Sequence, residues 1–93
     1  MDWPFEDPEN VAVFTSTHII KNRKDILYVS HDEDDGGWQF HSGDETKVED
    51  AMLVSLKYIY TIDPSIGLLA NLPLGYIAER ESKHDEWIVR KNK

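Results

Sequence analysis

The chain has 93 residues, of which 40% are hydrophobic and 11% aromatic, and its formal net charge is −8. This composition suffices for one apolar core, so we expect a single domain and no global disorder. The acidic balance disfavours nucleic-acid binding, because proteins gain that affinity by neutralising phosphates with Lys and Arg. The sequence has no cysteine, which excludes disulfides, thiolate zinc sites and thiol nucleophiles.

Targeting and membrane signals are not recognisable in the sequence. Residues 1–10 lack the basic start and apolar run of a secretory signal. No apolar stretch reaches the roughly 18–20 residues that a membrane helix needs. We therefore expect a cytoplasmic protein with no membrane partner. With two prolines and four acids, residues 1–10 are predicted to be an extended, poorly ordered lead-in to a domain over residues 11–93, although Trp3 and Phe5 could pack against that domain.

Two β-type segments are predicted first along the chain. Residues 11–15 and 26–30 are rich in β-branched and apolar side chains, which favours strands. A polar run at residues 21–25 lies between them. The pair is thus predicted to form a hairpin or to be joined by a short connection.

The third strand is predicted at residues 38–41, where Trp38 and Phe40 alternate with two polar residues. Alternation sends both rings to the same side of a sheet, and we expect them in the core. Glycines at 36–37 and Gly43 flank the strand and suit turns that need a positive φ.

The middle of the chain carries mixed signals. Ser42 matches a capping-box spacing, which predicts either a short helical turn through Asp50 or a plain turn. Residues 51–62 combine helical spacing with strand propensity. We favour a helix over residues 55–62 with Ser55 as its cap.

The last third predicts a short helix followed by a hairpin. Asp63 suits an N-cap and Pro64 a first helical residue, with the helix ending by residues 70–71. Residues 76–81 and 86–90 are predicted as the two strands of a C-terminal hairpin. The fold class is therefore α+β, with an antiparallel sheet of about five strands and one or two short helices inserted before that hairpin.

Negative charge is concentrated in residues 31–50, where eight acids against one lysine give −7 of the net −8. These acids are Asp32, Glu33, Asp34, Asp35, Asp44, Glu45, Glu49 and Asp50. Acidic turns around a strand favour a positively charged partner, and solubility alone is the alternative explanation. We predict these eight residues as a partner-binding set.

Metal binding is the competing hypothesis for this segment. A calcium loop counted from Asp32 fails, because its fifth and twelfth positions are glycines rather than oxygen ligands. His31 and His41 bracket the acidic loop and could converge on a transition metal together with Asp44 or Glu45.

Catalysis has no positive sign in the sequence. Ser42 lies near His41 and Asp44, but alternation sends adjacent strand residues to opposite faces. No nucleophile elbow and no glycine-rich phosphate loop is found. We expect a protein that is not an enzyme and that needs no cofactor.

The sequence resembles a bacterial family, the immunity protein 33-like domain, through a block that reads G-W-x-F-x-S-G-D-E. That block is residues 37–45, and weaker matching segments follow in order at residues 54–56, 63–66 and 72–80. The resemblance extends over about residues 11–89. It implies an α+β domain, often encoded beside secreted toxin systems, with a role in neutralising a toxin. It implies no catalytic residues.

The favoured hypothesis is a cytoplasmic, non-enzymatic binding protein of the immunity type. Its acidic loops at residues 32–35 and 44–50 would occlude a basic surface of a cognate toxin. The alternative is a regulatory domain that binds a small ligand or a divalent metal around His31 and His41.

Overall fold

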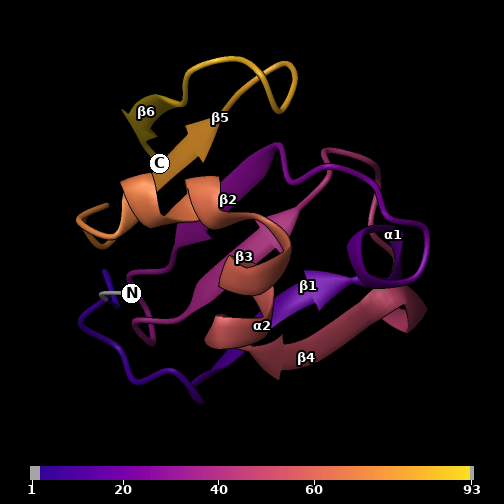
Figure 1. Ribbon diagram of the computed structural model, residues 1–93, viewed down its shortest axis with the longest axis horizontal. Coiled ribbons are helices and arrows are strands. Elements are labelled where there is room, and N and C mark those ends of the chain that lie inside the picture. Colours follow the sequence, from indigo (N-terminus) through magenta and orange to yellow (C-terminus); the bar gives the residue numbers. More distant parts are fainter. Residues whose placement is uncertain (1–2, 93) are drawn as a thin grey trace.

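The computed structural model describes residues 3–92, so Met1, Asp2 and Lys93 lie outside the described part of the chain. In chain order the elements are β1 (Ala12–Ser16), α1 (Thr17–Ile20), β2 (Tyr28–His31), β3 (Trp38–His41), the 3-10 helix η1 (Val48–Asp50), β4 (Ala51–Ser55), α2 (Leu56–Ile62), the 3-10 helix η2 (Pro64–Leu69), β5 (Tyr76–Glu79) and β6 (Ile88–Lys91). The described strands form one mixed sheet in the order β4-β1-β3-β2-β5-β6, and α2 and η2 lie over one of its faces (Figure 1). The predicted α+β class is confirmed. No helix between residues 3 and 92 is long and apolar enough to cross a membrane.

The sheet differs from the predicted antiparallel one in a single pair of strands. β1 pairs with β3 in parallel, whereas every other neighbouring pair is antiparallel. The predicted hairpin between the first two strands is therefore not formed, because β3 lies between β1 and β2. The helix α1 and residues 21–27 take the chain out of the sheet after β1. This connection leaves room for β3 to come back beside β1 after the tight β2–β3 turn.

The segment before α2 is a sixth strand that the sequence did not predict. The helix itself is confirmed, since Ser55 caps α2 by accepting a hydrogen bond from the Tyr58 N–H at 3.1 Å. The five residues of β4 pair with β1, from Ala12 opposite Ser55 to Ser16 opposite Ala51. A strand this short is defined by its partner, which is distant in sequence, and the local helical spacing obscured it.

The remaining local predictions are resolved by capping contacts. The segment after β3 is a plain turn, because the Ser42 hydroxyl donates to Asp44 and the next helical turn, η1, begins only after Lys47. Asp63 caps η2 by accepting from the Ser65 N–H at 3.1 Å, as predicted. The C-terminal hairpin is confirmed by the antiparallel pairing of β5 with β6. Its first strand, β5, ends at Glu79 and is therefore two residues shorter than predicted.

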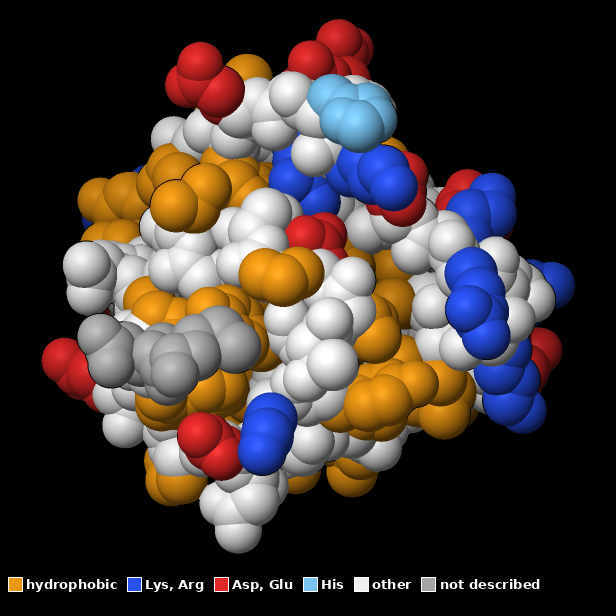
Figure 2. Space-filling model, in the orientation of Figure 1, with side chains coloured by type: hydrophobic (Ala, Val, Ile, Leu, Met, Phe, Trp, Pro, Cys, Tyr) orange, Lys and Arg blue, Asp and Glu red, His pale blue; other side chains and the backbone are white. Residues whose placement is uncertain are grey.

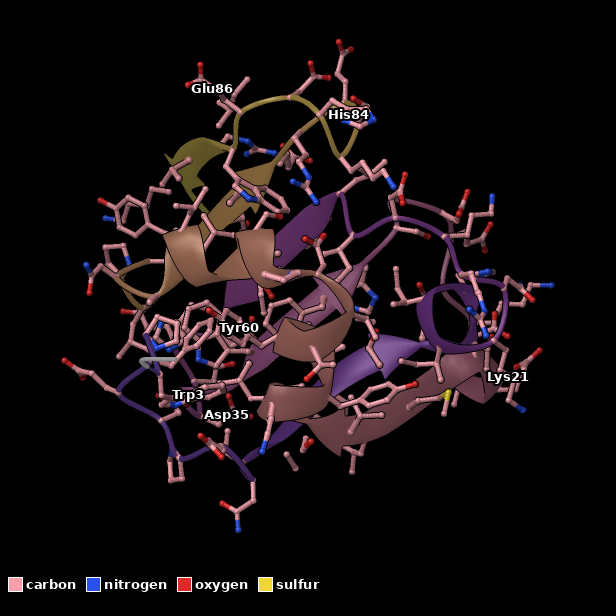
Figure 3. All side chains as sticks on the ribbon, viewed as in Figure 1. Trp3, Lys21, Asp35, Tyr60, His84 and Glu86 are labelled. Carbon is pink, nitrogen blue, oxygen red and sulfur yellow. The ribbon has the colours of Figure 1, made fainter. Side chains whose placement is uncertain are left out.

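The core lies between the sheet and the layer formed by α2 and η2. Trp38 and Phe40 are 2% and 0% exposed, as the strand alternation predicts. Phe5 is also buried and meets the Trp38 ring edge-on, with 5.4 Å between the ring centroids. Trp3 lies against Tyr60 at 5.5 Å (Figure 3). The N-terminal segment therefore packs against the core from residue 3 onward.

The opposite side of the sheet, which we call the open face, carries Phe14, Tyr28, Gln39, His41 and Leu53. These residues share a face because side chains alternate along each strand and because these residues pair with one another across the ladders. Phe14 remains 44% exposed and Leu53 61% exposed. Because α2 and η2 lie on the other side, this face is accessible to a partner.

A buried arginine joins the sheet to the helical layer. The Arg80 guanidinium donates to Asp63 Oδ2 at 2.7 Å, to Ser65 Oγ at 3.0 Å and to the carbonyl of Ile26 at 3.0 Å. It also lies 4.0 Å above the Trp87 ring. Its side chain is 2% exposed, so these contacts compensate for the loss of water around its charge.

We predict that Arg80→Ala lowers the free energy of unfolding by about 3 kcal/mol, because it leaves Asp63 partly buried without its counter-charge. Arg90→Ala is the matched control, since Arg90 forms an exposed ion pair with Glu79 and its loss is expected to cost below about 1 kcal/mol. Urea unfolding of both variants measures the difference. Equal losses would contradict the structural role given to Arg80.

Candidate partner-binding face

The predicted acids lie in two loops at opposite ends of β3. Residues 32–35 belong to the turn between β2 and β3, and residues 44–50 connect β3 to β4. The strand between the loops has four residues, so they are separated by on the order of 13 Å. The eight residues therefore form two groups rather than one cluster.

In the first loop, two of the four acids stabilise the turn itself. Asp32 accepts hydrogen bonds from Ser30 Oγ at 2.9 Å and from Gln39 Nε2 at 2.8 Å. Asp35 accepts from the Gly37 N–H at 2.8 Å. Glu33 and Asp34 are exposed, and neither side chain has a hydrogen bond or ion pair with the rest of residues 3–92.

The second loop divides in the same way. Asp44 accepts from Ser42 Oγ at 2.8 Å and pairs with Lys24, and these two contacts lower the pKa of its carboxyl. Asp50 accepts from the Lys47 N–H at 3.2 Å and so closes the start of η1. Within the described chain, the other two acids of the loop make no side-chain hydrogen bond or ion pair. They are Glu45 and Glu49.

A groove on the open face is bordered by the second loop. It has a volume of about 450 Å³, and its lining includes Phe14, Tyr28, Gln39, His41 and Asp44. Gln39 also lines a second hollow, which is otherwise formed largely by the acids of the first loop. The two acidic loops therefore border one continuous surface.

A chain of hydrogen bonds crosses the floor of this groove. His41 Nε2 lies 2.9 Å from Gln39 Oε1, and Gln39 Nε2 donates to Asp32 at 2.8 Å. Burial lowers the pKa of the His41 ring, and the nearby carboxylate of Asp32 opposes that shift. The contacts fix the orientation of the Gln39 amide, whose oxygen faces the His41 ring.

The predicted convergence of His31 and His41 is wrong. His31 pairs with Trp38 and His41 with Tyr28, so the two rings lie on opposite faces of the sheet. His31 stacks on Trp38 with 3.9 Å between the ring centroids, and its Nδ1 lies 2.6 Å from the carbonyl of Leu72. Among residues 3–92 no group of three or more His, Asp or Glu side chains is arranged to hold a metal ion.

Ser42, His41 and Asp44 are not arranged as a catalytic triad. Its hydroxyl donates to Asp44, whereas the His41 ring contacts Gln39. The acid, the base and the hydroxyl are thus not connected in the order that nucleophilic catalysis requires.

The sequence identified the acidic loops but missed the apolar part of the open face. Phe14 lies in a predicted strand, yet only its alternation with buried Val13 and Thr15 indicates that it faces outward. Leu53 was part of an apparent helical pattern, so its exposure could not be predicted without β4.

We predict that His41 weakens the fold as the pH falls. Because the pKa of its ring is lowered in the folded state, the unfolded chain binds more protons below about pH 6.5. The stability that the neutral ring contributes is therefore present above that pH and is lost as the pH falls toward the folded pKa. Ring titration by NMR measures this pKa, and urea unfolding of His41→Gln is expected to show a smaller loss between pH 7 and pH 5. A ring that titrates at or above 6.5 would contradict the burial argument.

Comparison with known proteins gives one match. The family model described as the immunity protein Imm33 domain matches residues 13–91, which includes both acidic loops and every strand except the first residue of β1. No curated protein and no solved structure matches the chain. Because the family model covers far more than half of the sequence, the chain belongs to the Imm33 immunity protein domain family.

Proposed function

We propose that this protein acts in the cytoplasm as an immunity protein, and that it neutralises a cognate toxin by stoichiometric binding without catalysis. The proposed partner surface is basic, as the substrate cleft of a nuclease is. The open face and the two acidic loops that border it would cover that surface and exclude the toxin's substrate. Membership of the Imm33 family supports the toxin-binding role.

The observation that carries this proposal is the set of acids that the fold does not use. Glu33 and Asp34 at one end of the open face, and Glu45 at the other, are exposed, and their side chains form no hydrogen bond or ion pair within residues 3–92. Like charges on neighbouring side chains repel one another and so favour no fold. A basic partner would offset this repulsion on binding. The free energy gained would depend on the partner's positive charge, which favours basic partners over neutral or acidic ones.

The acids and the apolar groove have different roles in this proposal. The carboxylates attract the toxin over a distance and orient it, which raises the association rate. Phe14 and the groove beside it then provide the contact that slows dissociation, since exposed aromatic side chains in the middle of an interface are common affinity anchors.

The first prediction concerns association. The triple variant Glu33→Lys, Asp34→Lys and Glu45→Lys is expected to bind the toxin about tenfold or more slowly at low salt, with a weaker dependence on ionic strength. The control carries the same change in charge at Glu6, Glu81 and Glu86, which are exposed elsewhere on the molecule; Figure 3 shows Glu86 in the β5–β6 hairpin, far from Asp35 in the first loop. Stopped-flow binding to the toxin co-purified from the native host measures both rates. Equal effects of the two triple variants would show that net charge alone matters and would remove the site assignment.

The second prediction concerns dissociation. Phe14→Thr preserves strand propensity in β1 and removes the exposed ring, so the toxin complex is expected to dissociate about tenfold faster while the association rate changes little. Ile88→Thr, an exposed apolar residue on β6, is the control. An unchanged lifetime of the Phe14→Thr complex would place the interface away from the open face.

A further inference from the structure

The groove on the open face has aromatic walls. Phe14 on β1 and Tyr28 on β2 both line it, and β3 lies between these two strands. Phe14 pairs with Gln39 and Tyr28 with His41, so the two rings flank the polar side chains of β3. Phe14 is 44% exposed, so a face of its ring is accessible. Such a face attracts cations, and a planar guanidinium can also stack on it.

A carboxylate with a free oxygen borders the same groove. Asp44 contacts Ser42 Oγ at 2.8 Å and Lys24 Nζ at 3.4 Å, and both contacts use its Oδ2. Within residues 3–92, Asp44 Oδ1 forms no hydrogen bond or ion pair. The carboxyl is ionised at neutral pH, because the two contacts lower its pKa. Asp44 can therefore accept from a further donor and keep its bond to Ser42.

The floor of the groove holds a histidine that the structure keeps neutral. Gln39 Nε2 donates to Asp32, so the Gln39 oxygen faces His41 and accepts from its Nε2–H. His41 Nδ1 is buried and has no hydrogen-bond partner within residues 3–92. A second proton on the ring would be a buried donor without an acceptor, which disfavours the charged form. The floor thus adds no positive charge at neutral pH, and a cation can lie against it.

The cations nearest to the groove leave Asp44 accessible. Arg23 and Lys24 follow α1 and line a separate hollow beside α2, and Figure 2 shows positive charge gathered over α1 on the side of the molecule where α2 lies. The ion pair of Lys24 with Asp44 is exposed, and such pairs contribute little to stability. Among residues 3–92, Lys47 is the one cation that lines the groove, and it is exposed. Its long side chain can turn into water when another cation enters.

We propose that the groove receives an arginine side chain of the toxin, with the guanidinium against the ring of Phe14 and an N–H donating to Asp44 Oδ1. This inference rests on the proposed function, because it names the group of the toxin that the open face recognises. A planar cation matches the aromatic walls, the free oxygen and the neutral floor together. Asp44 would repel a carboxylate, and an ammonium group is not planar and cannot stack.

Binding of ethylguanidinium tests the groove without the toxin. Ethylurea has the same planar shape and no charge, so it is the matched control probe. At concentrations too low to unfold the chain, ethylguanidinium is expected to shift the NMR signals of Phe14 and Gln39. It should also lower the pKa of the His41 ring, because a positive charge beside the ring opposes its protonation. Equal responses to the two probes, or no response to ethylguanidinium, would overturn the proposal.

A pair of variants tests the acceptor. Asp44→Asn removes the negative charge and keeps an oxygen for Ser42, and it is expected to weaken ethylguanidinium binding about threefold or more. Asp85→Asn is the control, because Asp85 also accepts from a serine, Ser82 Oγ at 3.1 Å, but lies in the β5–β6 hairpin. An equal effect of the two variants would contradict the role given to Asp44.

Competition with the toxin separates this inference from the proposed function. At equal ionic strength, ethylguanidinium chloride should weaken the toxin complex more than sodium chloride does, and Asp44→Asn should reduce that difference. A complex that responds to both salts alike would exclude an arginine in the groove and leave the immunity role intact. A chain that binds ethylguanidinium but no toxin would instead contradict the proposed function and retain the groove as a guanidinium site.

Discussion

The position of the helical layer over the sheet depends on one buried cation, the guanidinium of Arg80. Arg80 directly follows β5. Its guanidinium donates to Asp63 at the cap of η2 and to the backbone carbonyl of Ile26, just before β2. Asp63 in turn accepts from the Ser65 N–H, so the same carboxylate starts the helix and neutralises the arginine. The Arg80 side chain is only 2% exposed, so water cannot replace a lost partner. Each broken contact would leave part of the guanidinium buried without a hydrogen-bond acceptor. The contact thus ties the start of η2 to the end of β5, while Ile66 and Leu69 of η2 are buried in the core.

Because α2 and η2 cover one face of the sheet, the side chains on the opposite face remain exposed. Strand alternation assigns Trp38 and Phe40 to the covered side, and the residues between them must then face outward. Gln39 and His41 fill the outward positions of β3 and bond to each other, while Phe14 and Leu53 remain exposed beside them. The open face is therefore a consequence of how the core is built. Its mixture of polar groups and accessible apolar side chains is what a reversible protein interface requires.

Local sequence signals were sufficient for the elements whose defining contacts are local. The β3 alternation, the Ser55 cap of α2 and the Asp63–Pro64 start of η2 each depend on residues within a few positions of one another, and each was predicted correctly. The parallel pairing of β1 with β3 and the existence of β4 depend on contacts between segments about 25 to 40 residues apart. For the same reason the acidic loops could be identified in advance, whereas the groove on the open face could not.

The structure also divides the acidic segment by what each carboxylate does. Asp32, Asp35, Asp44 and Asp50 accept hydrogen bonds that shape their turns, so replacing them would alter the loops as well as the charge. Glu33, Asp34, Glu45 and Glu49 make no such contacts among the described residues. Both groups contribute equally to net charge, but only the second can change without a cost to the fold. A scaffold of this kind could acquire a new partner by substitutions at these free positions alone, because the turns that present them are held by the aspartates next to them.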